Sequence, residues 1–134
     1  MICLRFWIPG RTIPKARPRV GTKRPYLPAN YRCWRRLAEL EIINQIPAKY
    51  KSKLPIECAH ITIKFTGKHR GDPDNCSGSC LDALVSAGVL KDDSFSCIPE
   101  LVVSYDPLGE LGVAIALHAL PTKVAVVPKL AAKK

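Results

Sequence analysis

Five of the eleven acidic residues in this 134-residue chain fall within 22 positions, although the net charge of the chain is +10. They are Asp72, Asp74, Asp82, Asp92 and Asp93. Carboxylates that converge without a counter-charge raise one another's pKa, at about 1.4 kcal/mol for each pKa unit. A hard divalent cation removes this penalty, and oxygen-rich sites select Mg²⁺ or Mn²⁺. The cluster therefore predicts a metal site.

Spacing indicates which of these acids share the ion. Pro73 favours extended backbone in the residue before it, so Asp72 and Asp74 would emerge on the same side of an extended segment. A helix of about 15 residues would then return the chain to Asp92 and Asp93. Consecutive residues of an extended chain point in opposite directions, so we expect only one of these two to join the first pair.

The acids have two other interpretations. An EF-hand that starts at Asp72 would need Gly at its sixth position and Glu at its twelfth, where this chain has Ser77 and Ala83, so that interpretation fails. The string Asp72, Asp74, Asn75 is also compatible with ordinary turn and helix-cap residues, and spacing alone leaves that interpretation open.

Other residues of chemical interest have structural interpretations. We expect Asp82 to lie within the helix and to pair with a buried donor. His69 is the one histidine beside the acidic loop. The cysteines lack the spacing of a zinc site, and we interpret them as reduced thiols, among which Cys76 and Cys80 would need further ligands to bind a metal. They are Cys3, Cys33, Cys58, Cys76, Cys80 and Cys97.

The positive charge is concentrated in the first half of the chain. Residues 1–70 hold sixteen Lys and Arg against three acids, whereas residues 71–134 hold five against eight. A surface of this sign attracts phosphate backbones through counterion release, unless it is merely a solvated basic face. Together with a metal that activates water against a phosphodiester, it favours a nuclease. The expected phosphate-binding residues are Lys15, Arg17, Arg19, Lys23 and Arg24.

Four segments have the pattern of strands, and a fifth has the pattern of an extended loop. Residues 2–8 are rich in β-branched and aromatic types, and residues 57–65 alternate between apolar and polar types. The segments 97–105 and 111–120 flank a turn, "DPLGE", and read as an antiparallel hairpin. Between residues 11 and 28 four prolines predict an extended loop with outward charges.

Two helices are predicted. The first runs from Tyr31 to Gln45 behind an Asn30 N-cap, and the second follows the acidic loop and ends near Gly88. The residues near helical spacing in the first helix are Trp34, Leu37, Leu40 or Glu41, and Ile43 or Asn44. One apolar face of the second helix is marked by Leu81, Leu84, Val85 and Val89.

The predicted fold is therefore α/β of the α+β type. It is a single domain over residues 1–120 with a small mixed sheet, an antiparallel hairpin and two main helices, followed by a basic tail over residues 121–134. No apolar run approaches the roughly 18 residues that cross a bilayer, and Arg5 interrupts the apolar N-terminus. We expect a cytoplasmic protein without a membrane segment.

The strings "GDPDNCSGSCLDALVSAGVLKDD" and "PKARPRV" are similar to the RusA-type Holliday-junction resolvases, a family often carried by phages. The resemblance extends from Ile8 to about Leu117. It implies a small α/β homodimer that binds branched DNA and cuts it with Mg²⁺, in a bacterial or phage-infected cytoplasm. It also implies that Asp72, Asp74 and Asp93 are the catalytic, metal-binding carboxylates, and that the neighbouring Asp92 contributes less to the site.

One position departs from the family pattern. The family has a lysine four residues after the second aspartate, where it can stabilise phosphate charge, but this chain has Gly78. Arg70, Lys91 or Lys15 could supply the missing cation, and Arg70 is also expected to bind DNA. If none does, the protein binds junctions with little or no cutting. A third hypothesis is a basic structural protein with no preference for branched DNA.

Overall fold

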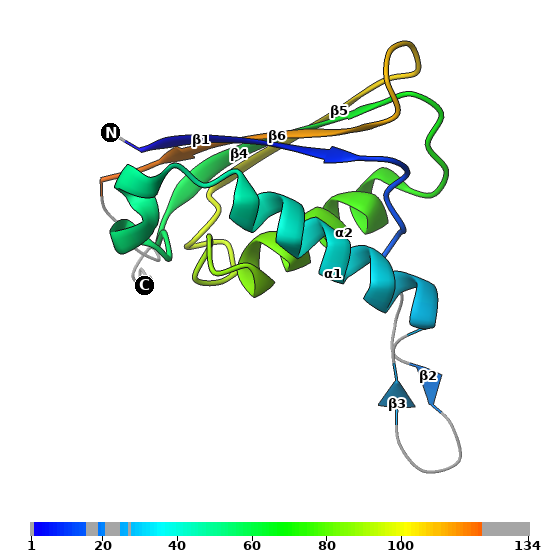
Figure 1. The fold of residues 1–134 in the computed structure, drawn as a ribbon, viewed down its shortest axis with the longest axis horizontal. Coiled ribbons are helices and arrows are strands. Elements are labelled where there is room, and N and C mark those ends of the chain that lie inside the picture. Colours follow the sequence, from blue (N-terminus) through cyan, green and yellow to red (C-terminus); the bar gives the residue numbers. More distant parts are fainter. Residues whose placement is uncertain (1, 16–18, 21–24, 27, 122–134) are drawn as a thin grey trace, which may run out of the picture.

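The computed structural model describes residues 2–15, 19–20, 25–26 and 28–121, which form one four-stranded sheet with two helices on one face (Figure 1). The elements are β1 (Cys3–Pro9), β2 (Arg19–Val20), β3 (Pro25–Tyr26), α1 (Ala29–Asn44), the short 3-10 helix η1 (Ala48–Lys53), β4 (Ala59–Thr66), α2 (Pro73–Ser86), β5 (Glu100–Asp106) and β6 (Gly112–Ala119).

The sheet is mixed, with the strand order β1-β6-β4-β5. Strand β6 is antiparallel to both of its neighbours, whereas β5 is parallel to β4. Parallel neighbours need a crossover connection, and here α2 lies in that connection. The predicted α+β domain with a mixed sheet and two main helices is confirmed.

The predicted hairpin of residues 97–105 and 111–120 is wrong. Both segments are strands, but β4 lies between them, so that Ile63 is paired with Val103 on one side and with Ile115 on the other. Burial explains the order. Strand β6 has an apolar, largely buried face and takes a central position, whereas β5 is mostly exposed and lies at the edge.

The core lies between the sheet and the helices. The alternation predicted for β4 is confirmed, because Ile61, Ile63 and Phe65 are buried and the intervening Thr62 and Lys64 are exposed. The matching faces of the adjacent strands add further buried residues, namely Leu4, Phe6, Ile8, Val113, Ile115 and Leu117.

Helix α1 differs from its prediction in its start and in its buried face. It begins at Ala29 after an N-cap at Pro28, and the Asn30 side chain accepts a hydrogen bond from the Tyr31 N–H at 2.8 Å. Of the apolar residues predicted at helical spacing, Trp34 is buried, whereas Leu37, Leu40 and Ile43 are exposed. The residues that α1 buries are Tyr31, Trp34, Ala38 and Ile42.

Helix α2 buries only part of its predicted apolar face, since Leu84 and the following Val89 are buried as predicted. Its most buried apolar residues are Cys76, Cys80, Ala83 and Leu84, whereas the predicted Leu81 and Val85 are only half-buried. The predicted end near Gly88 is confirmed, since Gly88 has a φ of +82° directly after the helix. Small residues thus allow α2 to pack closely against its neighbours, among which α1 lies nearest.

Part of the basic segment docks against α2. The Lys15 N–H donates to the Asn75 carbonyl at 3.0 Å, and the Ser79 hydroxyl donates to the Ile13 carbonyl at 2.6 Å. Beyond this contact, the short antiparallel pair of β2 and β3 projects away from the four-stranded sheet (Figure 1).

Some predictions fall outside the described residues. They include Arg17, Lys23, Arg24 and the tail from residue 122 onward, and only the backbone of Arg19 is described, as part of β2. Among the helices that the structure describes, none has the length and apolar character needed to span a membrane.

Candidate active site

Asp72 and Asp74 stand at the N-terminus of α2. Asp72 is the N-cap, with extended backbone (φ −87°, ψ 144°), Pro73 is the first helical residue and Asp74 belongs to the first turn. Pro is well suited to the first position of a helix, where its missing N–H is not needed. The two carboxylates therefore emerge from a helix start, not from the continuous extended segment that spacing suggested.

Within the described residues, each of the two carboxylates accepts one hydrogen bond at the helix start. Asp72 makes no side-chain cap hydrogen bond and accepts only a long bond of 3.4 Å from the Asn75 side chain. Asp74 accepts from the Asn75 N–H at 3.0 Å. Both residues are exposed, and neither forms an ion pair with any cation in the described part of the chain. Two such carboxylates fit a hard divalent cation that keeps several waters.

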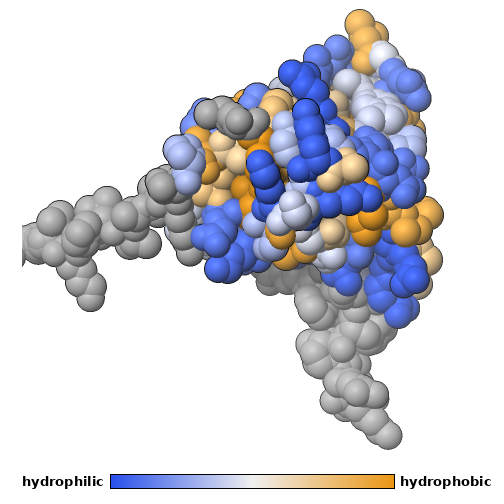
Figure 2. Space-filling view, turned by 60° about the vertical axis from the view of Figure 1, so that its left-hand side comes forward, coloured by the Kyte–Doolittle hydropathy of each residue, from blue (hydrophilic) through white to orange (hydrophobic). Residues whose placement is uncertain are grey.

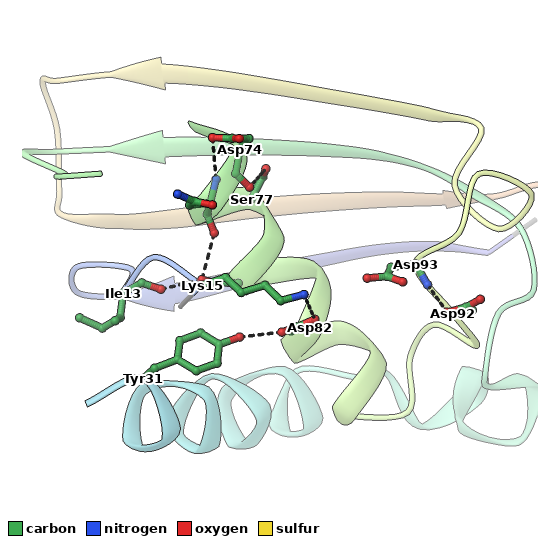
Figure 3. Close-up of polar contacts among 10 residues, drawn as sticks. Ile13, Lys15, Tyr31, Asp74, Ser77, Asp82, Asp92 and Asp93 are labelled. Atoms are coloured by element: carbon green, nitrogen blue, oxygen red, sulfur yellow. Dashed lines mark hydrogen bonds and ion pairs between the residues drawn. The ribbon is translucent and has the colours of Figure 1, made fainter. Parts of the chain in front are cut away.

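Asp92 and Asp93 lie at the opposite end of α2. The loop that contains them is fixed there, because the Leu90 N–H bonds to the Leu84 carbonyl and the Lys91 N–H to the Ile56 carbonyl. The 14 residues of α2 span about 20 Å. Figure 3 shows Asp74 near one end of the helix and the two loop aspartates beyond the other.

The structure thus brings Asp72 and Asp74 together but does not bring Asp93 to them within one chain. Over residues 2–15, 19–20, 25–26 and 28–121, no three side chains of His, Cys, Asp or Glu are grouped so that they could hold a metal ion. The assignment of Asp72, Asp74 and Asp93 as metal ligands stays a prediction.

Asp82 has the buried donor that the sequence predicted. The hydroxyl of Tyr31, a residue that is 1% exposed, donates to Asp82 Oδ2 at 2.7 Å. Burial, followed by the bond to Asp82, raises the pKa of Tyr31, so this hydroxyl keeps its proton. The second carboxylate oxygen accepts from Lys15 Nζ at 3.2 Å (Figure 3). Sequence analysis did not predict this ion pair.

A mainly apolar cavity of about 170 Å³ adjoins Asp72. Arg70 also lines it, and this places one of the predicted DNA-binding residues next to the acid pair. Its lining includes Phe65, His69, Val103 and Tyr105, and the rings of Phe65 and His69 meet edge-on at 5.3 Å. Burial lowers the pKa of His69, so its ring is neutral near pH 7.

The cysteines match their interpretation as reduced thiols. All six are free, and only Cys3 and Cys33 are exposed. Burial raises the pKa of Cys80, and burial together with the charges of Asp72 and Asp74 raises the pKa of Cys76. A thiol with a raised pKa is a poor nucleophile, so Cys76 and Cys80 are poorly suited to nucleophilic chemistry.

Comparison with known proteins adds an independent observation. The family model described as Endodeoxyribonuclease RusA matches residues 9–117, a range that includes the acid pair, α2 and the Asp92–Asp93 loop. A search of curated protein sequences found no match. Because the family model covers most of the chain, the protein belongs to the RusA family of endodeoxyribonucleases, which are hydrolases that cleave phosphodiester bonds of DNA.

Proposed function

We propose that this protein is a Mg²⁺-dependent endonuclease, with Mn²⁺ as a possible substitute, that resolves Holliday junctions and related branched DNA. The observation that carries the proposal is the pair of exposed carboxylates at the start of α2, Asp72 and Asp74, which form no ion pair with a described cation. Bound there, a divalent cation would polarise a phosphodiester and lower the pKa of an attacking water.

The basic residues would gather and orient the DNA. Arg70 lines the cavity beside Asp72, and the exposed Lys68 and Arg11 come from the same region of the chain and from the loop after β1. The proposed contacts to phosphate are Lys15, Arg17, Arg19, Lys23, Arg24 and Arg70. Such contacts position DNA without reading its sequence.

We further propose that the protein is a homodimer and that Asp93 of one subunit completes the site of the other. A junction presents two equivalent strands about an approximate two-fold axis, and a C2 dimer matches it with two equivalent sites. Within one chain Asp93 lies about a helix length from the acid pair, so a second copy offers the direct way to unite them.

The exposed edge of β5 is the surface best suited to this dimer. Five of the eight exposed large hydrophobic residues among those described fall between positions 95 and 108, namely Phe95, Leu101, Val102, Tyr105 and Leu108. Figure 2 shows one face of the molecule, on which hydrophobic patches interrupt a hydrophilic surface. An uncovered apolar edge strand is an aggregation hazard unless a partner pairs with it.

Pairing of two copies of β5 along their exposed edges would also run in the direction that the shared site requires. Two copies of β5 related by a two-fold axis run antiparallel, so the start of one lies against the end of the other. The Asp93 loop precedes β5, and the acid pair follows β4, which is parallel to β5. Antiparallel pairing would therefore carry Asp93 of one subunit toward Asp72 and Asp74 of the other.

Cleavage of a synthetic four-way junction tests the function. The purified protein should cut the junction in Mg²⁺ but not in EDTA, whereas Asp74→Asn should bind it and leave it intact. Linear duplex of the same sequence serves as the substrate control. Equal cutting by the two proteins would refute the assignment of Asp74, and equal binding to duplex and junction at matched salt would favour the structural hypothesis.

Gly78 favours a second candidate function, a junction-binding protein that cuts slowly or not at all. Glycine supplies no charge where the family pattern has a lysine. This candidate predicts salt-sensitive binding without nicks in Mg²⁺ or Mn²⁺. Nicks made by the unmodified protein and absent with Asp74→Asn would eliminate it.

A further inference from the structure

Lys15 lies over the glycine that interrupts the family pattern. A Cβ atom built on Gly78 would be 3.4 Å from Lys15 Cδ and 3.8 Å from Lys15 Cβ. These are ordinary van der Waals distances, so the stem of Lys15 occupies the space into which a longer side chain at position 78 would extend. The Lys15 side chain can follow this course because Gly78 has no side chain there.

The backbone around Lys15 is held firmly against α2. The Lys15 N–H bonds to the Asn75 carbonyl in the first turn of the helix, and the Ser79 hydroxyl bonds to the Ile13 carbonyl. Pro14 packs so closely on Gly71 that a Cβ there would lie 2.6 Å from Pro14 Cγ. These contacts fix the origin of the Lys15 side chain beside the helix start that bears the acid pair.

The ammonium group of Lys15 has a defined resting place. It donates to Asp82, whose other oxygen is held by the Tyr31 hydroxyl (Figure 3). Asp74, Gly78 and Asp82 recur every fourth residue and share one face of α2. Because the side chain starts near Asn75, between the two acids, it can turn along this face toward either of them.

The pair of Lys15 and Asp82 is weak enough to exchange. The Lys15 side chain is 47% exposed and that of Asp82 20%, and exposed pairs of this kind contribute little to stability. A phosphate that arrives at Asp74 would offer the ammonium group a second anionic partner on the same face of the helix. The resting contact would keep the ammonium close to the site without neutralising Asp72 or Asp74.

We infer that Lys15 supplies, from another part of the fold, the cation that a lysine at position 78 would provide, and that Asp82 and Tyr31 are its positioning residues. In this inference, which rests on the proposed function, Lys15 Nζ moves from Asp82 to an oxygen of the phosphate held at Asp72 and Asp74. There it stabilises the negative charge that develops during hydrolysis.

Single-turnover cleavage of a four-way junction in Mg²⁺ tests this inference. Lys15→Met keeps the apolar stem but removes the charge, and we expect it to slow cutting about 100-fold. Its junction affinity should fall less than about tenfold, because only one phosphate contact is lost. Lys51→Met, an exposed residue of η1 that the mechanism does not use, should cut at the wild-type rate.

Moving the positive charge from position 15 to position 78 gives a sharper test. We expect Lys15→Ala combined with Gly78→Lys to cut at least tenfold faster than Lys15→Ala, whereas the matched pair Lys15→Ala with Gly78→Met should show no recovery. The inference fails if Lys15→Met cuts within threefold of the wild type while Asp74→Asn is inactive. It also fails if the folded, junction-binding Lys15→Ala, Gly78→Lys protein shows no recovery.

The unmodified protein separates this inference from the proposed function. If it does not cut but Gly78→Lys alone does, Lys15 does not supply the charge, although the site is a nuclease site. If neither protein cuts, the proposed nuclease function itself fails, and the inference fails with it.

Discussion

Asp82 shows what can and cannot be predicted about a residue from its place in a helix. Its position near the apolar face predicts a buried donor, and Tyr31 provides that donor. The identity of the partners was not predictable, because Tyr31 and Lys15 lie 51 and 67 positions away in the sequence. Likewise, the types of Asp72 and Asp74 predicted a metal site, whereas their geometry at a helix start depends on Pro73.

His69 should make the stability of the protein depend on pH below neutrality. Its pKa is lowered in the folded state by burial, so the unfolded chain binds a proton first as the pH falls through about 6.5. Stability is then lost as the pH decreases, by at most about 1.4 kcal/mol for each pH unit. Urea unfolding at pH 7.5 and 5.5 should show a smaller acid-induced loss for His69→Phe than for the wild type. The same loss in both proteins would contradict this role.

The helices and strands themselves were easier to predict than which of them pair or pack with one another. Strand β4 has strict alternation and was predicted within two residues of its observed bounds, because its polarity pattern is local. The order of β5 and β6 was not predictable from the turn between them, because β6 pairs on its two edges with β1 and β4, which are distant in the sequence. Helix α1 has apolar residues on more than one face, so its pattern did not determine which face meets the sheet.

The C-cap side chain of α1 bonds to the backbone of the edge strand β1, and this contact gives an element-scale prediction. Gln45 accepts from the Trp7 N–H at 2.7 Å and donates to the Trp7 carbonyl at 2.8 Å. Gln45→Leu leaves both backbone groups without these partners and should lower the free energy of unfolding by about 1–3 kcal/mol.

The neighbouring Asn44 offers a matched control, because it is exposed at the last position of the same helix. Asn44→Leu makes the same kind of change and should alter stability by less than about 0.5 kcal/mol. Denaturant unfolding of the three proteins measures both effects. Equal stability of Gln45→Leu and Asn44→Leu would show that the clamp on Trp7 contributes nothing.

At the scale of the whole molecule, family membership follows from one long match, but assembly does not. The third carboxylate of the predicted site, Asp93, lies beyond the far end of α2, so within the described residues only two of the three predicted ligands, Asp72 and Asp74, lie together. A sequence contains no direct signal for contacts between copies. The exposed apolar residues of β5 suggest a contact between copies only once the strand is known to lie at an edge of the sheet.

The proposed dimer predicts that a charge on the edge of β5 separates the subunits. Val102→Lys places an ammonium group on that edge and should convert dimer to monomer in analytical ultracentrifugation, with loss of junction cutting. Thr62→Lys is the matched control, because Thr62 is exposed and paired with Val102 on the adjacent central strand. It should remain dimeric. A dimeric Val102→Lys protein that still cuts would place the subunit contact elsewhere.

The most direct test of the shared metal site is to mix two inactive proteins, Asp74→Asn and Asp93→Asn, and to assay a four-way junction in Mg²⁺. Each variant alone should be inactive. In a mixed dimer, one site combines both substitutions, while the other keeps Asp72 and Asp74 from one subunit and Asp93 from its partner. The account predicts that mixing restores cutting, as a single nick in each junction. If the mixture stays as inactive as its components although mixed dimers form, Asp93 does not complete the partner's site, and the central claim is contradicted.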